Sequence, residues 1–260
     1  MSERIAIVTG GANGIGRAIA LELAAAGGVV AVLDREAEAA AAVAAEIGGR
    51  SIALPLDVSD SEACRSTVAE VHRRFGRIDH LVNSAGSFIA AGQHATDADW
   101  DRILAVNVRG CATMVAAVAP LMAAGGGGAI VNIGSVSAKV AQAGRWTYNA
   151  TKGAITTLTK CQALDLAADG IRVNVVQPGW VWTREVERAA GGDRERWEPV
   201  WGRYAMLRRL ADPWEIARPT AFLLGEGASF ITGAEIPVDG GYLALGPEGL
   251  GETAAFAGSD

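Results

Sequence analysis

Short runs of aliphatic and β-branched residues recur along the whole chain, and alanine-rich stretches of helical length separate them. The runs show no clear alternation of polar positions, as expected for strands that helices cover on both faces. Parallel strands need a crossover helix to return the chain, so this order predicts βαβ units and a parallel sheet. The expected strands are Ile5 to Thr9, Val29 to Leu33, Ile52 to Leu56, His80 to Ser84, Ala129 to Ile133, Ile171 to Gln177 and Glu235 to Val238.

Helix signals agree with this α/β organisation. Asp212 followed by Pro213 is typical of an N-cap and a first helical residue, and the acidic stretch from Thr96 opens another helix. We therefore expect one α/β domain over residues 1–242, a doubly wound parallel sheet of about seven strands. Residues 184–211 are rich in arginine, acid and tryptophan, and we expect them to form a lobe that covers the substrate. Residues 243–260 are small and polar, which predicts a C-terminal tail that is disordered or lies on a neighbouring subunit.

A stretch without charged residues between Arg109 and Lys139 could be mistaken for a membrane span. Pro120, the glycines at 125–128 and Asn132 divide it. This division predicts a buried helix, a turn and a buried strand.

Composition and charge narrow the class of protein. Half of the 260 residues are apolar and a fifth are charged, which is typical of a folded globular chain. A net charge of -6 disfavours partners such as nucleic acid or an anionic membrane, which require basic patches. The cysteines and histidines lie far apart without ligand-like spacing, and the N-terminus has no export signal, so we expect a cytoplasmic protein without a metal site.

The first strand runs directly into a glycine-rich turn, Thr9-Gly10-Gly11-Ala12-Asn13-Gly14-Ile15-Gly16, and then into an alanine-rich helix. Glycine lets the backbone turn sharply and lets a pyrophosphate approach the free N–H groups at a helix N-terminus. The spacing is GxxxGxG rather than GxGxxG, so the generic fingerprint supports phosphate binding in outline.

Asp34 ends the second predicted strand, about twenty residues beyond the turn, where an acid can accept hydrogen bonds from the adenosine ribose. A 2′-phosphate would be repelled by this carboxylate at a cost of roughly one kcal/mol or more. We therefore expect NAD rather than NADP, although Arg35 beside it could soften the discrimination, and Asp34 could also cap the following helix.

Tyr148 and Lys152 stand four residues apart at the start of a predicted helix, which places both side chains on one face. An unperturbed phenol has a pKa of about 10 and is a poor base near neutrality. A neighbouring ammonium and an oxidised nicotinamide both stabilise a phenolate, so the pair is a candidate proton-transfer centre. On its own the YxxxK spacing is also common for a core tyrosine beside a solvated lysine.

Further matches accompany this pair in chain order: Ser135 follows the fifth strand, and Asn107 lies in the helix before it. Alone, these would read as a loop-capping serine and a helix-bonding asparagine. Together they resemble the short-chain dehydrogenase/reductase family, with matches from TGGANGIG through Asp57-Val58, Asn83-Ser84-Ala85-Gly86, YNATK and Pro178-Gly179 to Gly233 and Asp239-Gly240-Gly241.

The resemblance implies a single Rossmann-type domain, usually assembled as a tetramer or dimer. It implies that Tyr148 is the acid/base, that Lys152 holds the nicotinamide ribose, that Ser135 bonds the substrate oxygen and that Asn107 anchors a water-linked proton relay. The cofactor residues that it and the glycine turn indicate are Gly10, Asn13, Gly14, Ile15, Gly16, Asp34, Arg35, Asp57, Val58, Asn83, Ala85, Gly86, Tyr148, Lys152, Pro178, Gly179, Val181 and Thr183.

Several of these matches have simpler explanations, and two positions depart from the family wording. Asp57 could cap the helix near Ser59, and Pro178-Gly179 could be only a turn. Asn83-Ser84 stands where two asparagines are usual, and Gly134 where serine is frequent.

Tryptophans and arginines near the predicted site bear on the substrate. Flat tryptophan faces suit a cyclic substrate such as a sugar ring, although most could simply pack the lobe. The lobe arginines could receive an anionic group, but acidic neighbours make a mutually paired surface the favoured interpretation. The tryptophans are Trp146, Trp180, Trp182, Trp197 and Trp201, with Ser135, Tyr148, Trp146, Trp180 and Trp182 as candidate substrate contacts, and the arginines are Arg184, Arg188, Arg194, Arg196 and Arg203.

These observations favour an NAD-dependent dehydrogenase of a secondary alcohol, with a sugar or cyclic polyol as the expected small-molecule substrate. A carbonyl reductase similar to 3-oxoacyl carrier-protein reductases is the alternative enzyme, but it predicts a basic group in place of Asp34. A protein that senses NAD without turnover is an alternative of another class. We expect a homotetramer or homodimer that packs through the uncharged helix after Arg109 and the helix carrying Tyr148.

Overall fold

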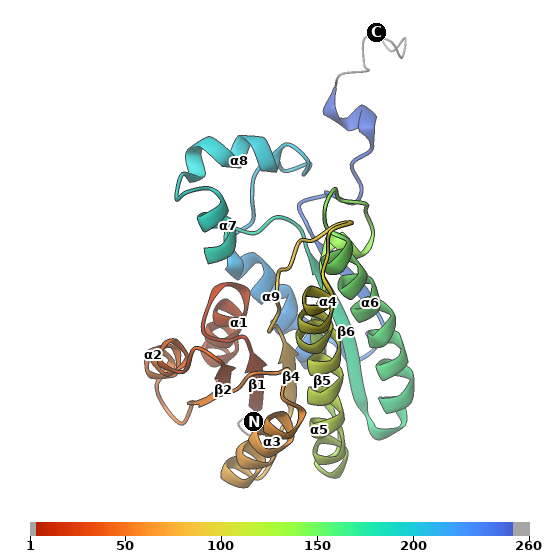
Figure 1. Ribbon diagram of the computed structural model, residues 1–260. Helices are drawn as coiled ribbons and strands as arrows, with labels where there is room; N and C mark the ends of the chain where they lie inside the picture. The colour runs from red at the N-terminus through yellow and green to blue at the C-terminus, as the bar shows by residue number, and fades with distance from the viewer. Residues whose placement is uncertain (1–3, 252–260) are drawn as a thin grey trace.

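Seven parallel strands form one sheet in the order β3-β2-β1-β4-β5-β6-β7 (Figure 1). The computed structural model describes residues 4–251. The order reverses direction between β1 and β4, which is where doubly wound sheets open a crevice at their carboxyl edge. The predicted parallel sheet and its strands are confirmed, with bounds β1 Ile5–Thr9, β2 Val29–Asp34, β3 Ile52–Pro55, β4 His80–Asn83, β5 Gly128–Ile133, β6 Ile171–Pro178 and β7 Glu235–Val238.

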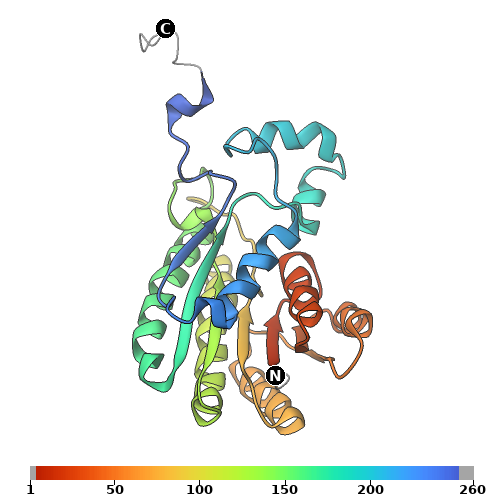
Figure 2. The same ribbon diagram turned by 180° about the vertical axis from the view of Figure 1, so that it is seen from behind.

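Helices cover both faces of this sheet (Figures 1 and 2). One face carries α1, α2 and α9, and the other carries α3, α5 and α6. Asp212 and Glu215 form a capping box at the start of α9, and Thr96 and Asp99 form one at the start of α4, as the acidic patterns predict. The helices are α1 Gly14–Ala25, α2 Ala37–Ile47, α3 Ser61–Phe75, α4 Asp97–Leu104, α5 Cys111–Ala124, α6 Trp146–Leu166, α7 Arg184–Ala189, α8 Arg194–Gly202 and α9 Pro213–Leu224.

The strand side chains form rows that alternate between the two faces. Ile7 pairs in register with Leu81, and Leu81 with Ile130, and all three lie in the core on the α3/α5/α6 side. The neighbouring row, which includes Val8 and Val82, faces α1 and α9. Burying one such side chain stabilises the fold by about 1.5–3 kcal/mol. These buried rows hold the central strands rigidly, so the loops that follow their carboxyl ends start from fixed positions.

The uncharged stretch is a core helix, a glycine turn and a strand. Within residues 4–251, the helical segment Asp97–Ala124 is the one long and apolar enough to cross a membrane. Its side chains Met114, Val118 and Met122 are fully buried in the α/β core. The helix continues through Pro120, which removes one backbone donor near the helix end without breaking it.

Two short helices lie outside the layers. In Figure 1, α7 and α8 stand over the carboxyl edge of the sheet, between β6 and α9 in sequence. Residues 243–251 follow β7 and contain the 3₁₀ turn Pro247–Leu250. The rest of the predicted tail lies outside the described residues.

Candidate active site

A cavity of about 690 Å³ opens at the carboxyl edge of the sheet, where the strand order reverses. Its size is typical of a site for a small molecule or cofactor. The glycine turn, the loops that follow β4, β5 and β6, and the start of α6 and α7 form its walls. Of the predicted residues it is lined by Gly10, Asn13, Gly14, Ile15, Gly16, Gly86, Ser135, Tyr148, Lys152, Pro178, Gly179, Trp180, Val181 and Thr183.

The glycine turn is packed so closely that residues with a side chain cannot replace the glycines at its key positions. Gly10 has a φ of 65°, and a Cβ there would lie 2.8 Å from the backbone of Ala85. A Cβ on Gly16 would lie 2.1 Å from the carbonyl oxygen of Gly10. The N-cap residue of α1, Asn13, makes no side-chain capping bond. Free N–H groups of α1 are therefore available to a ligand in the cavity.

Asp34 lies at the end of β2, beside the glycine turn. Its carboxylate accepts hydrogen bonds from the backbone N–H of Ala12 at 3.1 Å and of Glu36 at 3.0 Å. The N-cap of α2 is Glu36 rather than Asp34. Arg35 is exposed, and neither Asp34 nor Arg35 belongs to the lining of the cavity. Asp34 thus fixes the turn against the strand end.

Glu36 was not predicted, and its carboxylate faces both the turn and the lobe. It accepts two hydrogen bonds from Arg184 of α7, at 2.8 and 2.6 Å, and one from the Asn13 amide at 3.4 Å. The hydrogen bonds from Arg184 lower the pKa of Glu36 to about 2. The lobe and the glycine turn are therefore joined through one carboxylate.

Tyr148 and Lys152 lie on the same side of α6 and both face the cavity. The Lys152 ammonium lies 5.5 Å from the centre of the Tyr148 ring. The lysine is buried, and its Nζ donates to the carbonyl oxygen of Ile133 at 2.9 Å. That bond anchors the ammonium at the end of β5, so one turn of α6 presents a phenol and a cation to the same space.

Ser135 enters the cavity from the loop after β5. Its hydroxyl accepts a hydrogen bond from the N–H of Ser137 at 3.1 Å and donates one to the Ser137 hydroxyl at 3.0 Å. The serine therefore caps a 3₁₀ turn, Val136–Ala138, as well as lining the cavity. These bonds hold the Ser135 hydroxyl in the lining of the cavity, which Tyr148 also lines.

Asn107 lies in a π-helical segment, Ala105–Gly110, between α4 and α5. Its amide accepts from the N–H of Ser87 at 2.7 Å, and it donates to the Ser87 carbonyl at 3.1 Å and to the Thr151 hydroxyl at 3.0 Å. The widened helix thus clamps the loop after β4 to α6. Segments of this kind are frequent at functional sites.

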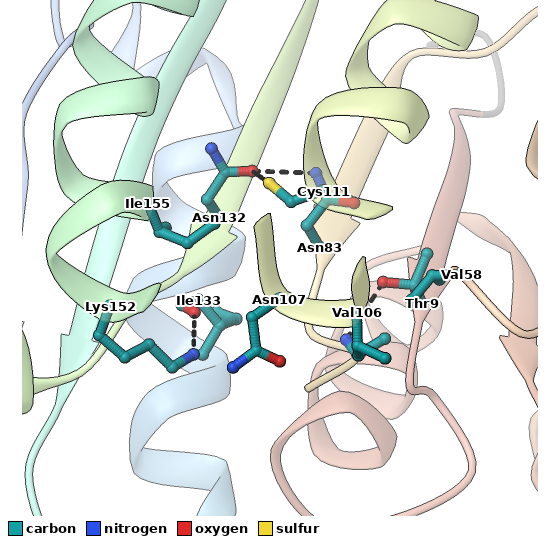
Figure 3. A pocket seen from close by; sticks show the side chains of 11 residues that line it. Thr9, Val58, Asn83, Val106, Asn107, Cys111, Asn132, Ile133, Lys152 and Ile155 are labelled. Atoms are coloured by element: carbon teal, nitrogen blue, oxygen red, sulfur yellow. Dashed lines mark hydrogen bonds between the residues drawn. The ribbon is translucent and has the colours of Figure 1, made fainter. Parts of the chain in front are cut away.

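A second, very small cavity of about 10 Å³ lies beneath the first, and Figure 3 shows its side chains. Lys152 lines both cavities, and Asn107 lines the small one. The side-chain oxygen of Asn83 is buried without a hydrogen-bond partner, while its nitrogen donates to Asn132 at 2.9 Å. Burial raises the pKa of the neighbouring Cys111 thiol to about 12, so this thiol stays neutral. The space is about one water molecule in size.

Thr9 holds the loop after β4, and the sequence did not indicate this contact. The Thr9 hydroxyl accepts from the N–H groups of Ser84 at 3.1 Å and Ala85 at 3.2 Å. The predicted strand therefore ends at Asn83, because Ser84 turns its N–H toward this hydroxyl. Asn83 and Ala85 line the small cavity.

Asp57 and Val58 lie after β3 on the same edge of the sheet. Asp57 accepts from the N–H and hydroxyl of Ser59 at 2.9 and 2.7 Å and from Arg102 at 3.3 Å. Burial raises the pKa of Asp57, but the bonds from Ser59 and the Arg102 charge outweigh it and lower the pKa overall. Asp60, not Asp57, caps α3. Val58 is buried in the lining of the small cavity.

The predicted tryptophans differ in whether they line the cavity. Trp180 lines the cavity and stacks on Trp201 of α8 at 5.3 Å, and Trp201 stacks on Trp197 at 4.9 Å. Trp146 is 59 % exposed at the start of α6 and does not line the cavity. Trp182 lies outside the lining too, because its ring packs under the Arg194 guanidinium. Neither of these last two residues belongs to the lining, and their role as substrate contacts stays a prediction.

Most lobe arginines are paired with acids. Arg188 contacts Glu185 at 3.4 Å, and Arg194 contacts Glu198 at 3.1 Å and Asp212 at 2.8 Å. Together with the pair formed by Arg184, these contacts are the mutually paired surface that the alternating charges indicate.

The cavity residues that the sequence did not indicate include Phe88, Gln142 and Arg145. They lie in the irregular loops after β4 and β5. No periodicity or motif marks such positions, so only the folded chain shows that they line the same cavity as Tyr148.

Comparison with known proteins agrees with this geometry. Residues 10–243 match the family model described as Enoyl-(Acyl carrier protein) reductase. D-threitol dehydrogenase of Mycolicibacterium smegmatis is 38% identical over 246 residues, 93% of this chain and 94% of that protein. Meso-2,3-butanediol dehydrogenase of Serratia marcescens is 39% identical over 244 residues, 93% of this chain and 95% of that protein.

The fold has similar solved structures. A putative short-chain alcohol dehydrogenase from Sinorhizobium meliloti 1021 superposes with a TM-score of 0.87 at 37% identity, over 94% of this chain and 98% of that one. The chain belongs to the short-chain dehydrogenase/reductase family.

Proposed function

We propose that this protein oxidises a secondary alcohol to a ketone, or catalyses the reverse reaction, with NAD as its cofactor. The observation that carries the proposal is the placement of Tyr148 and Lys152 on one side of α6, facing a cavity that the glycine turn also lines. Members of this family use a nicotinamide cofactor, and relatives include dehydrogenases named for threitol and butanediol.

The residues present fit a dinucleotide. A Cβ at Gly16 would fill the turn, and the uncapped start of α1 offers N–H donors to a pyrophosphate. Gly10, Gly14 and Gly16 would hold the phosphates, and Lys152 and Thr183 would lie along the nicotinamide end. When bound, the nicotinamide supplies the hydride acceptor for alcohol oxidation.

Four side chains carry out the remaining chemistry, which is substrate positioning and proton transfer. The Ser135 hydroxyl holds the substrate oxygen beside Tyr148, and the Tyr148 oxygen takes the hydroxyl proton as hydride leaves the carbon. The Lys152 ammonium stabilises the negative oxygen through its charge. Asn107, with one water molecule in the small cavity, would pass the proton that Tyr148 has taken onward from the Lys152 end of the site to solvent, so that Tyr148 can accept the next proton. The reverse direction moves the same proton from Tyr148 to the ketone oxygen.

We assign NAD over NADP because of Asp34. Its carboxylate lies at the end of β2 beside the glycine turn, where an adenosine ribose lies in proteins of this fold. A 2′-phosphate would meet this carboxylate. The same acid argues against the carbonyl-reductase alternative, which predicts a basic group there.

The substrate class that we propose is a sugar or cyclic polyol. Phe88 packs edge-on against Tyr148 with ring centres 4.8 Å apart, and Trp180 faces the same cavity. Flat rings in the lining of the cavity that holds the reacting phenol suit a cyclic substrate. Residues 184–211 would cover it, as part of the domain formed by residues 1–242.

We further propose that the protein is cytoplasmic and assembles as a homotetramer or homodimer. The three cysteines of each chain are free thiols, which suits a reducing compartment. Leu164 on α6 is 78% exposed, and a subunit contact would cover it.

The experiment that tests the function is a screen of sugars, cyclic alcohols and hydroxy acids for reduction of NAD by the wild type and by Tyr148→Phe. The variant loses the transferable proton and is expected to lose about 100- to 10,000-fold in kcat, with NAD binding retained. Tyr204→Phe, which changes an exposed lobe tyrosine, is the matched control. Unchanged activity of Tyr148→Phe would remove the phenol from the mechanism.

A further inference from the structure

One guanidinium in the wall of the cavity stands between two aromatic rings. The Arg145 Cζ lies 5.3 Å from the centre of the Phe88 ring and 5.4 Å from that of the Trp180 ring. Phe88 in turn packs against Tyr148, and Trp180 against Trp201. Arg145 therefore belongs to a continuous row of rings that starts at the proposed reactive phenol and ends in the lobe.

No acid in the described part of the chain pairs with Arg145. Within residues 4–251, Arg145 donates one hydrogen bond, to the Gln142 side-chain oxygen at 3.4 Å, beyond the usual range for a strong bond. The Arg184 guanidinium in the same lining is bonded to Glu36, and the Lys152 ammonium to a backbone carbonyl. Among the described residues that line the cavity, Arg145 is thus the cation that bonds neither an acid nor a backbone carbonyl.

The stacked position orients these donors. A guanidinium that lies against aromatic faces keeps its N–H groups in its own plane, where they can bond an acceptor in pairs. Carboxylate, sulfonate and phosphate oxygens match that fork. The only acid that lines the cavity, Glu185, contacts Arg188 at 3.4 Å and Arg184 at 3.8 Å, so an entering anion meets no unpaired carboxylate.

A polar chain links the same arginine to the proposed substrate-oxygen site. The Ser135 hydroxyl donates to Ser137, the Ser137 hydroxyl donates to Gln142 at 2.7 Å, and Arg145 donates to the same Gln142 oxygen. Ser135 and Arg145 are therefore the two ends of one hydrogen-bonded wall. A substrate that bonds Ser135 through its hydroxyl can reach Arg145 with a second group.

We propose that Arg145 is a specificity residue that binds an anionic group, such as a carboxylate, on the alcohol substrate. The inference rests on the proposed function and sharpens its substrate class, from a neutral cyclic polyol to a cyclic or polyhydroxy acid. Phe88 and Trp180 hold the guanidinium in the wall of the cavity.

Binding of a ligand that cannot react tests this without relying on turnover. Calorimetry compares cyclohexanecarboxylate with cyclohexanecarboxamide, which has nearly the same shape without the charge, on the wild type in the presence of NADH. The carboxylate is expected to bind at least about tenfold more tightly, the size of one charged hydrogen bond. Arg145→Gln is expected to abolish that preference, and Arg145→Lys to keep part of it because the charge remains without the fork.

The matched control is Arg196→Gln. Arg196 lies over Trp197 on α8 with its Cζ 5.4 Å from the ring centre, and it does not line the cavity. This variant removes the same charge from the same kind of stacked pair and is expected to keep the preference. Equal binding of both ligands to the wild type would overturn the role of Arg145. So would an equal loss of the carboxylate preference in Arg145→Gln and Arg196→Gln.

A kinetic arm separates this inference from the proposed function. For 4-hydroxycyclohexanecarboxylate, Arg145→Gln is expected to raise KM about tenfold with little change in kcat, and to leave KM for the carboxamide unchanged. Oxidation of both compounds at equal kcat/KM would refute the anion site and leave the dehydrogenase function standing. Tight carboxylate binding that depends on Arg145, without turnover of any alcohol, would support the anion site and count against the dehydrogenase.

Discussion

The Arg184 guanidinium and the Glu36 carboxylate form two parallel hydrogen bonds, of 2.8 and 2.6 Å, between α7 and the start of α2. The two residues are 148 positions apart in the chain. Glu36 also accepts from Asn13 in the glycine turn, and Arg184 lines the cavity. The pair therefore joins the lobe to the glycine turn.

Breaking this pair is expected to loosen the cofactor. Arg184→Gln and Glu36→Gln should each raise the dissociation rate of NAD about two- to fivefold, the range expected for an exposed ion pair. Stopped-flow fluorescence measures the rate, and Arg188→Gln on the outer side of α7 is the control. Additive effects in the double variant would show that the two side chains do not act together.

The same pair has a defined pH range. The pKa of Glu36 is lowered from 4.5 to about 2 by the hydrogen bonds from Arg184. A lowered carboxyl pKa stabilises the folded state above pH 4.5, and the contribution is lost as the pH falls toward 2. The difference in unfolding free energy between wild type and Glu36→Gln should therefore be constant near neutrality and shrink only below pH 4.5. A difference that vanished already at neutral pH would contradict the pairing.

Cofactor choice is expected to depend on Asp34. Asp34→Ala should raise the ratio of kcat/KM for NADP to that for NAD by about tenfold, because roughly one kcal/mol or more of repulsion is removed. Asp34→Asn removes the charge but keeps an acceptor for the N–H of Ala12, so it separates repulsion from local unfolding. Asp60→Ala, at the cap of α3, should leave the ratio unchanged. An unaltered ratio in both Asp34 variants would remove the acid from cofactor selection.

The glycine turn offers a test by a single methyl group. Gly16→Ala places a Cβ 2.1 Å from the Gly10 oxygen, so the turn must move, and NAD binding should fall by at least about tenfold. Gly153→Ala on α6 meets nothing within 4 Å and should stabilise the helix by up to about 1 kcal/mol. Calorimetry and urea unfolding report the two effects. Normal NAD affinity of Gly16→Ala would show that the turn does not hold the cofactor.

The proposed assembly is tested at the outer face of α6. Leu164→Glu adds a charge to an exposed apolar side chain and should shift the protein toward smaller species by light scattering. Val200→Glu, on α8, is a control of similar character. A monomeric wild type would contradict the assembly itself.

The sheet was predictable because its strands follow local rules. Unbroken apolar runs such as Val29 to Leu33 can only be buried on both faces, and the alanine-rich stretches between them supply crossovers. Strand ends differ by a residue or so from the prediction. At Ser84 the reason is tertiary, since its N–H bonds to the hydroxyl of Thr9 on another strand.

Motif residues were predictable for a similar reason. Tyr148 and Lys152 share a helix face because they are four residues apart. The glycines of the turn are predictable because the backbone geometry of the turn favours glycine. Trp146 and Trp182 do not line the cavity, because proximity in sequence to the site does not fix the direction of a side chain in a loop or at a helix start. Their role as substrate contacts stays a prediction.

The sequence by itself determined the sheet, its parallel direction and the residues of the glycine turn and the tyrosine–lysine pair, because periodicity and short spacings act within one element. Only the tertiary structure decided which side chains from other elements line the same cavity as Tyr148. Phe88, Arg145 and Trp180 come from three separate loops or helix ends, and packing of the whole chain brings them into one row. Contacts between elements far apart in sequence leave no local pattern, so this wall of the cavity exists only in the folded protein.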